Sequence, residues 1–369
     1  MNDSKKNVKV VVLGDIGRSP RMQYHCTSLS ELGHQVDVIG YGDTEPMELP
    51  QIPIKYINYA KSTCNPCLSS LLDLYYNNWH NYAHSIMALN VGEANPLVKI
   101  TKKVEIIFGH KADYNFCVTK AMREDLQAKW NIKAVTLYDR PPTIFKSISF
   151  EEKHRFLLNF AKKYNKIFLG SQEGETVFSE ITNGSVKFKS PRPGLLVSGT
   201  SWTEDEDFSI LLTALQEYEN QCESGNPRKL PKLICVITGK GPMKEYYIKK
   251  VTELNWKHVV IITPWLDAED YPLLLASADL GVSLHTSSSG LDLPMKVVDI
   301  LNELVKNGEN GFMFTSSQEL SKQILDWFED FPNNQKQQQL EAKFKIELQS
   351  FQNLRWKENW EFIAAPVFS

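Results

Sequence analysis

The residues best suited to chemistry lie between His285 and Asp299. They follow an apolar run, 278–284, that is typical of a buried strand. A short polar loop comes next, and Pro294 then favours the start of a helix with Lys296 and Asp299 on one face. The free N–H groups of a helix start attract phosphate, a lysine adds positive charge, and the following acid can accept hydrogen bonds from ribose hydroxyls. The pattern predicts a site for a nucleoside diphosphate; the alternative is an ordinary loop with a solvated lysine.

A second candidate is the glycine- and arginine-containing loop that follows the strand predicted for residues 8–13. Gly14 and Gly17 allow a tight turn and the close approach of a ligand, and Arg18 and Arg21 could hold a diphosphate through paired hydrogen bonds. Open α/β sheets bind ligands at the carboxyl ends of their strands, where this loop lies. A tight turn with two solvated arginines is the alternative.

Two further loops follow predicted strands in the second half of the chain. Residues 198–207 combine hydroxyl groups, among them Ser201, with the start of a helix, which suits an anionic ligand. Plain helix capping explains the same residues equally well. In the loop 238–242 two glycines clear space and Lys240 supplies charge, although the spacing is not that of a P-loop. An exposed lysine without a ligand is the alternative there.

A histidine in the aromatic segment 79–82 is the candidate for proton transfer. The histidine side chain in general titrates near neutrality, so His80 could serve as a base or donate a hydrogen bond to phosphate. A packed histidine in an aromatic turn is the alternative.

Composition and charge narrow the class of protein. With 369 residues, 42% of them apolar and 23% charged, the chain is long enough for two domains of ordinary globular composition. The formal net charge of -3 argues against a general affinity for nucleic acid. The isolated C-x-x-C at Cys64 and Cys67 has no second pair at zinc spacing, so no metal site is predicted. No signal peptide and no apolar stretch of about 18 residues is evident, which predicts a soluble or peripheral chain.

Strand and helix patterns alternate in two series along the chain. The predicted strands are apolar runs of the kind buried on both faces of a parallel sheet; they cover residues 8–13, 35–39, 52–57, 115–119, 132–138, 194–198, 232–238, 259–262 and 280–284. Helices are predicted over 20–32, 208–219 and 271–277, and a charged helical segment over 335–360. Two such series predict an α/β protein with two doubly wound domains facing across a cleft.

Domain boundaries are predicted from a change in composition. Residues 146–190 are mixed and polar and end in the breaker cluster 190–193, which is interpreted as the linker region. The predicted domains are therefore residues 1–185 and 186–330, followed by a C-terminal helical segment, 331–369.

Taken together and in order, these motifs resemble those of the chitobiosyldiphosphodolichol beta-mannosyltransferases over almost the whole chain. The resemblance is carried by long segments at 11–25, 79–82, 119–125, 200–210, 238–242 and 287–299. It implies a GT-B fold with two Rossmann-like domains. It also implies inverting transfer of mannose from GDP-mannose to GlcNAc2-diphosphate-dolichol on the cytosolic face of the endoplasmic reticulum membrane.

Residue roles follow from the same resemblance. Ser201, Lys240, Lys296 and Asp299 of the second domain are expected to bind the donor, with Lys240 and Lys296 at the diphosphate and Asp299 at the ribose. The Gly14–Arg21 loop and His80 are expected to face the acceptor. The resemblance requires neither a cofactor nor a metal, because lysines and helix starts are available to stabilise the departing GDP.

Three departures from the family pattern are visible. The family normally starts with a membrane-anchoring helix, and from its sequence this chain is expected to lack one. It is also shorter between Leu74 and Trp79, and again between Asp299 and Leu304. At each of these two places the family carries a further buried strand.

The shorter segments keep a second hypothesis open. It is a catalytically impaired relative that acts only as a binding partner of other glycosyltransferases of lipid-linked oligosaccharide assembly. A third hypothesis, a nicotinamide-dependent oxidoreductase, is disfavoured because the first loop reads G-x-x-G rather than G-x-G-x-x-G.

Overall fold

The computed structural model describes residues 6–42, 79–80, 84–85, 88, 91–141, 143–203, 206–224, 228–284, 306–352 and 355–368. The chain forms two compact units. The first comprises residues 1–142, 287–293 and 354–369, and the second comprises residues 143–286 and 294–353. The sequence predicted a boundary at residue 185 and a separate segment from 331, whereas the structure divides the chain at 142 and returns its last residues to the first unit.

The second unit is built on a four-stranded parallel sheet with strand order β10-β9-β8-β11. Its strands are β8 (Gly194–Gly199), β9 (Leu233–Thr238), β10 (Val259–Ile262) and β11 (Leu280–Val282). Every residue of β8 and β9 is buried, as expected for strands covered on both faces.

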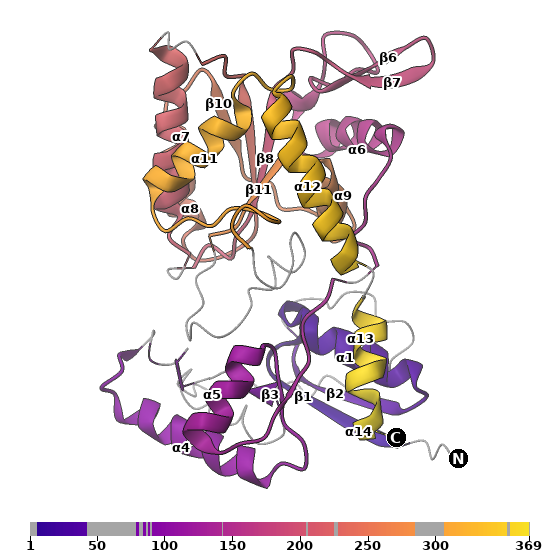
Figure 1. The fold of residues 1–369 in the computed structure, drawn as a ribbon, viewed down its shortest axis with the longest axis vertical. Helices are drawn as coiled ribbons and strands as arrows, with labels where there is room; N and C mark the ends of the chain where they lie inside the picture. Colours follow the sequence, from indigo (N-terminus) through magenta and orange to yellow (C-terminus); the bar gives the residue numbers. More distant parts are fainter. Residues whose placement is uncertain are drawn as a thin grey trace. The chain divides into compact units, whose positions relative to one another are not determined.

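Helices cover both faces of this sheet (Figure 1). Alternate side chains of its central strands belong to opposite core layers. One face packs against α7 (Phe208–Glu223), α8 (Lys244–Thr252), α11 (Ser317–Phe328) and α12 (Gln335–Gln352). The other packs against α6 (Phe150–Lys163) and α9 (Asp270–Ser277). Leu196 and Cys235 belong to the first layer, and Leu195 and Val236 to the second. The unit is therefore doubly wound, as predicted.

The segment predicted to be a linker is instead folded into the second unit. It contains α6, the 3-10 helix η2 (Lys166–Phe168) and an antiparallel hairpin of β6 (Ser179–Thr182) and β7 (Ser185–Phe188). Ser149 begins α6 with a reciprocal capping box to Glu152, and Phe160 and Phe168 are buried against the sheet. The burial of these aromatic side chains explains why the segment belongs to this domain.

The first unit has two small parallel sheets, with strand orders β1-β2 and β3-β4-β5. Its elements are β1 (Asn7–Asp15), η1 (Ile16–Arg18), α1 (Pro20–Glu31), β2 (Gln35–Tyr41), β3 (Trp79–His80), α4 (Pro96–Lys111), β4 (Phe116–Cys117), α5 (Lys120–Trp130) and β5 (Val135–Thr136). The strands predicted for 115–119 and 132–138 are present but shorter. The strand predicted for 52–57, Cys64 and Cys67 lie outside the described residues.

The C-terminal helices α13 (Trp356–Ile363) and α14 (Ala365–Phe368) pack on the first unit, and Figure 1 shows α13 (yellow) beside α1 (indigo). The indole of Trp356 donates to Ser28 Oγ at 3.0 Å, and that of Trp360 donates to His25 Nδ1 at 2.8 Å. Both tryptophan rings are buried in a core shared with β1 and β2. The first unit is therefore completed by the end of the chain.

Within the described ranges, no helix combines the length and the apolar character that spanning a membrane requires.

Candidate active site

The order of strands in the second unit defines where a ligand is expected. The chain runs outward from β8 to β9 to β10 and then crosses back to β11 on the other side of β8. In open α/β sheets, ligands bind at the carboxyl ends of strands beside such a reversal. The loops after β8, β9 and β11 leave the sheet at this edge. The loop after β11 leads into residues 285–305, so Lys296 and Asp299 lie outside the described residues.

The loops after β8 and β9 pack backbone against backbone. A Cβ atom on Gly239 would lie 1.7 Å from the carbonyl oxygen of Thr200, and one on Gly241 would lie 1.7 Å from that of Ser201. Gly239 also has a φ of +148°, which other residues rarely adopt. Only glycine therefore allows these loops to meet, and their contact brings the predicted residues Ser201 and Lys240 into one surface.

A buried carboxylate holds the loop after β8. The Ser201 N–H donates to Glu206 Oε2 at 2.6 Å, and the Thr200 hydroxyl donates to the same oxygen. Glu206 and Thr200 are both buried, whereas Ser201 is exposed. The N-terminus of α7 is capped by a different residue, Asp207, whose side chain accepts a hydrogen bond from the N–H of Ser209 at 3.0 Å. Ser201 is therefore not the cap of α7.

Lys240 is exposed and lies against an aromatic ring. Its Nζ is 4.0 Å from the ring centroid of Trp265, which follows β10 at the same edge of the sheet. A cation–π contact at an exposed site contributes about 0.5–1 kcal/mol. A charge-assisted hydrogen bond contributes about 1.5–3 kcal/mol, so a phosphate group could draw Lys240 away from the ring.

Lys244, in the first turn of α8, connects the loops after β9 and β10. Its Nζ donates to the carbonyl oxygens of Gly239 at 3.2 Å and Thr263 at 3.0 Å. Burial lowers the pKa of Lys244 below its usual value, and the positive charge of Lys240 adds to this effect. Lys244 thus fixes the spacing between the loop that carries Lys240 and the segment that carries Trp265.

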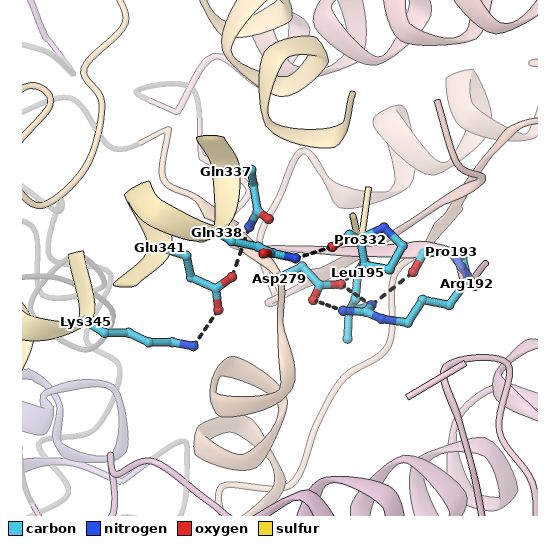
Figure 2. A network of polar contacts seen from close by, with 9 residues as sticks. All are labelled: Arg192, Pro193, Leu195, Asp279, Pro332, Gln337, Gln338, Glu341 and Lys345. Atoms are coloured by element: carbon cyan, nitrogen blue, oxygen red, sulfur yellow. Dashed lines mark hydrogen bonds and ion pairs between the residues drawn. The ribbon is translucent and has the colours of Figure 1, made fainter. Parts of the chain in front are cut away.

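The amino edge of the same sheet has a different character, which Figure 2 shows at close range. The two terminal guanidinium nitrogens of Arg192 donate to the carboxylate of Asp279, each at 2.8 Å, and the N–H of Leu195 donates to that carboxylate at 2.9 Å. The guanidinium also lies 4.5 Å from the ring centroids of Phe188 and Phe331. This pair joins the beginnings of β8 and β11, the two strands that flank the reversal.

The predicted residues of the first unit lie at the end of β1 and in α1. Gly14 is within β1, Gly17 is in η1, and the side chain of Arg18 lies outside the described part of the chain. Arg21 Nε donates to Asp139 Oδ1 at 2.8 Å, and its Nη2 also contacts this carboxylate, which is buried. At least two of its five donors therefore serve the fold.

His80 lies in β3, where it pairs with Cys117 of β4, and its side chain is likewise outside the description. Among the described residues, no group of three His, Cys, Asp or Glu side chains is placed to hold a metal ion.

Three residues at the carboxyl edge were not predicted from the sequence. Glu206 was one of several acids before α7, and Lys244 was one of several charged residues after the Gly239 loop. For Trp265 a usable signal existed, because an aromatic residue that comes shortly after a predicted strand is placed at the ligand edge of an open sheet.

Solved structures share this architecture. Sucrose-phosphate synthase from Thermosynechococcus elongatus superposes with a TM-score of 0.60 at 11% identity, over 99% of this chain and 98% of that one. A glycosyltransferase from Rickettsia africae gives a TM-score of 0.57 at 14% identity, over 96% of this chain and 95% of that one. The second unit is doubly wound, and the C-terminal helices α13 and α14 pack on the first unit. Together with these two superpositions, this shows that the chain has the GT-B fold of glycosyltransferases, as predicted.

Sequence relatives define the family. The human chitobiosyldiphosphodolichol beta-mannosyltransferase is 39% identical over 433 aligned positions, covering 98% of this chain and 92% of that protein. A protein of Arabidopsis thaliana named UDP-glycosyltransferase TURAN is 37% identical and covers 98% of this chain and 96% of its own length. No family model matches the chain. The chain belongs to the chitobiosyldiphosphodolichol beta-mannosyltransferase family and is a glycosyltransferase.

The alignment with the human protein also bears on the shorter segments. It extends over 433 positions, more than the 369 residues of this chain. The human protein therefore contains internal stretches without a counterpart here, and their position between residues 74 and 79 and between 299 and 304 stays a prediction.

Proposed function

We propose that this chain transfers mannose from GDP-mannose to chitobiose-diphosphate-dolichol with inversion at the sugar carbon. The observation that carries the proposal is the 39% identity, over 98% of the chain, to a protein named chitobiosyldiphosphodolichol beta-mannosyltransferase. The carboxyl edge of the second unit supports it, because the loop with the exposed Lys240 packs there against the loop with Ser201. The reaction releases GDP, whose developing charge needs positive groups nearby.

In this proposal the donor occupies the carboxyl edge of the second unit. Ser201 and Lys240 bind its diphosphate together with Lys296, and Asp299 binds the ribose. The strand reversal between β8 and β11 supports the assignment, because residues 285–305 continue from the end of β11.

The acceptor diphosphate is assigned to the loop with Gly14, Gly17, Arg18 and Arg21. Arg21 forms an ion pair with Asp139, and this pair holds α1 to the segment after β5. In this proposal Arg18 supplies the larger share of the charge offered to the acceptor. His80 is the proposed base that accepts the proton of the attacking sugar hydroxyl.

A lipid-linked acceptor places the enzyme at a membrane surface, which we propose to be the cytosolic face of the endoplasmic reticulum. The exposed residues of α4 support contact with lipid. Ile100 and Ile107, two turns apart, are both about half exposed, and four lysines of the same helix are exposed: Lys99, Lys102, Lys103 and Lys111. The acid of this helix, Glu105, is buried. A helix with exposed apolar and cationic side chains suits the interface of an anionic bilayer.

Thermal unfolding with added nucleotides tests the donor. A ligand that binds only the folded state raises the midpoint, and at 100 times its dissociation constant it adds about 2.7 kcal/mol. GDP and GDP-mannose are expected to stabilise the protein, and UDP is the control, because the Arabidopsis relative is named a UDP-glycosyltransferase. Stabilisation by UDP but not GDP would contradict the proposed donor.

Transfer itself is tested with radiolabelled GDP-mannose and a chitobiosyl-diphosphate lipid in vesicles. The folded wild-type protein is expected to form a mannosylated lipid, and the Lys296→Ala variant is not. If the folded, GDP-binding protein forms no product, the catalytic proposal fails and the binding-partner hypothesis takes its place.

A further inference from the structure

One exposed ring at the carboxyl edge has no role in the donor site described so far. Trp265 is 50% exposed, although it comes directly before the buried Leu266. By contrast, Trp202, in the adjoining loop, is 1% exposed and packs against Phe208 and Tyr247. The core of the unit therefore holds one of the two tryptophans and leaves the other at the surface where ligands bind.

The position of Trp265 is fixed by neighbouring contacts. Lys244 donates to Thr263, two residues before Trp265, and to Gly239, one residue before Lys240. One ammonium group therefore holds the two segments together. As a result, an aromatic face and an exposed positive charge lie side by side, with Nζ of Lys240 4.0 Å from the ring centroid of Trp265.

We propose that Trp265 is the stacking surface for the nucleobase of the donor, and that Lys240 moves from this ring to the diphosphate when the donor binds. The inference rests on the proposed donor site and adds a base subsite to it. A nucleoside diphosphate carries a flat base at one end and two anionic phosphates at the other. Bases stack on aromatic side chains, and lysine binds phosphate as a point charge. The two side chains thus match the two ends of the ligand.

The chain contains a matched pair for comparison. Tyr246 on α8 is also 50% exposed, and Nζ of Lys250 lies 4.5 Å from its ring centroid. This pair is on the surface of a helix rather than in a loop at the end of a strand. Its chemistry resembles that of the Trp265–Lys240 pair, but no donor group is expected there.

Calorimetric titration of the 369-residue chain with GDP and with inorganic pyrophosphate tests the inference, because pyrophosphate has no base. Trp265→Ala is expected to weaken GDP binding about tenfold and to leave pyrophosphate binding within about twofold. Trp265→Phe, which keeps a ring, is expected to retain most of the affinity for GDP. Lys240→Ala is expected to weaken both ligands, and Tyr246→Ala neither. Thermal unfolding without ligand confirms that each variant is folded.

Tryptophan fluorescence provides a second measurement. GDP is expected to change the emission of the wild-type protein, and most of that change should disappear in Trp265→Phe. The inference is overturned if GDP binds the wild type and Trp265→Ala equally well, or if pyrophosphate binding falls as much as GDP binding. Failure of GDP to bind even the wild type would overturn the donor site itself, and the base subsite with it.

Discussion

The two edges of the sheet in the second unit use positive charge in different ways. At the amino edge, the side chain of Arg192 is 7% exposed, pairs with Asp279 through two hydrogen bonds and contacts two aromatic rings. At the carboxyl edge, Lys240 is exposed and contacts a single half-exposed ring. A buried charge that is paired within the fold cannot be given up to a ligand without loss of stability, whereas an exposed charge that is held only weakly is available to a ligand.

The same contrast separates the two candidate phosphate sites. Arg21 in the first unit is paired with a buried carboxylate, and Lys240 in the second unit is not held by any comparable ion pair among the described contacts. A cation near the end of a parallel strand is therefore a useful indication of a ligand site only when its partners in the fold are known.

The largest expected effect is on stability, from breaking the ion pair at the amino edge. Asp279→Ala leaves the buried guanidinium of Arg192 without its counter-charge and is expected to lower the free energy of unfolding by about 3 kcal/mol. Urea denaturation of the second unit measures the change. Asp326→Ala is the control, because Asp326 pairs with Arg228 on the exposed surface, where such pairs contribute about 0–1 kcal/mol. Equal losses of unfolding free energy in the two variants would show that the buried Arg192–Asp279 pair stabilises the protein no more than an ion pair at the surface.

An intermediate effect is expected from the buried carboxylate beneath the donor loop. Glu206→Ala leaves the N–H of Ser201 and the hydroxyl of Thr200 without their acceptor, which is expected to cost about 2 kcal/mol of stability. GDP binding should weaken as well, because the loop loses its fixed geometry. Glu223→Ala, at the other end of α7 and paired with Lys257 at the surface, should change neither quantity by much. If Glu206→Ala leaves the affinity for GDP unchanged, the loop after β8 is not part of the donor site.

A pH effect is expected in the first unit, outside the donor site. Burial, with a smaller effect of Arg21, lowers the pKa of His25 well below its usual value near 6.5. Below that pH the unfolded chain binds a proton that the folded unit excludes, so stability falls as pH falls, by at most about 1.4 kcal/mol per pH unit.

Urea denaturation at pH 7 and pH 5.5 measures this effect. His25→Gln should flatten the pH dependence, and His110→Gln, at an exposed position, should leave it unchanged. If the two variants show the same pH dependence, His25 is not its source.

The smallest effect on stability is expected at Lys240, with a clear effect on binding. Lys240→Ala should change the free energy of unfolding by less than about 0.5 kcal/mol, because the side chain is exposed and its cation–π contact is weak. Pyrophosphate affinity should nevertheless fall about tenfold, as expected from the loss of one charge-assisted contact. Lys232, exposed at the opposite end of β9, is the matched control. A similar loss of affinity in Lys232→Ala would indicate general electrostatics rather than a site at the carboxyl edge.

Much of the fold was predictable because the central strands are buried on both faces. Continuous apolar runs gave β9 to within one residue and β10 without error. The segment 146–190 was misjudged as linker, although Ser149 and Glu152 form a capping box and Asn183-Gly184 is a typical hairpin turn. Those signals are local, and the polar composition of the segment obscured them. Its place in the second unit depends on long-range burial of Phe160 and Phe168, which the pattern does not contain.

The candidate site was predictable only in part. Gly239 and Gly241 singled out the loop of Lys240, because close approach of two backbones requires glycine, whereas Ser201 was predicted as a hydroxyl group beside a helix start. Arg21 was predicted on charge alone, and its pairing with Asp139, 118 residues away, could not be read from the sequence. The roles of Lys244 and Glu206 likewise depend on contacts between loops that only the fold brings together.

Hydrogen–deuterium exchange of the full-length protein, with and without saturating GDP, tests the central proposal most directly. If the carboxyl edge of the second unit binds the donor, GDP should slow exchange in residues 199–203 and 239–243 and in the segment 285–299. Exchange at the amino edge, around Arg192 and Asp279, should not change. Protection confined to the amino edge or to the first unit, or no protection at all at saturating GDP, would contradict this account.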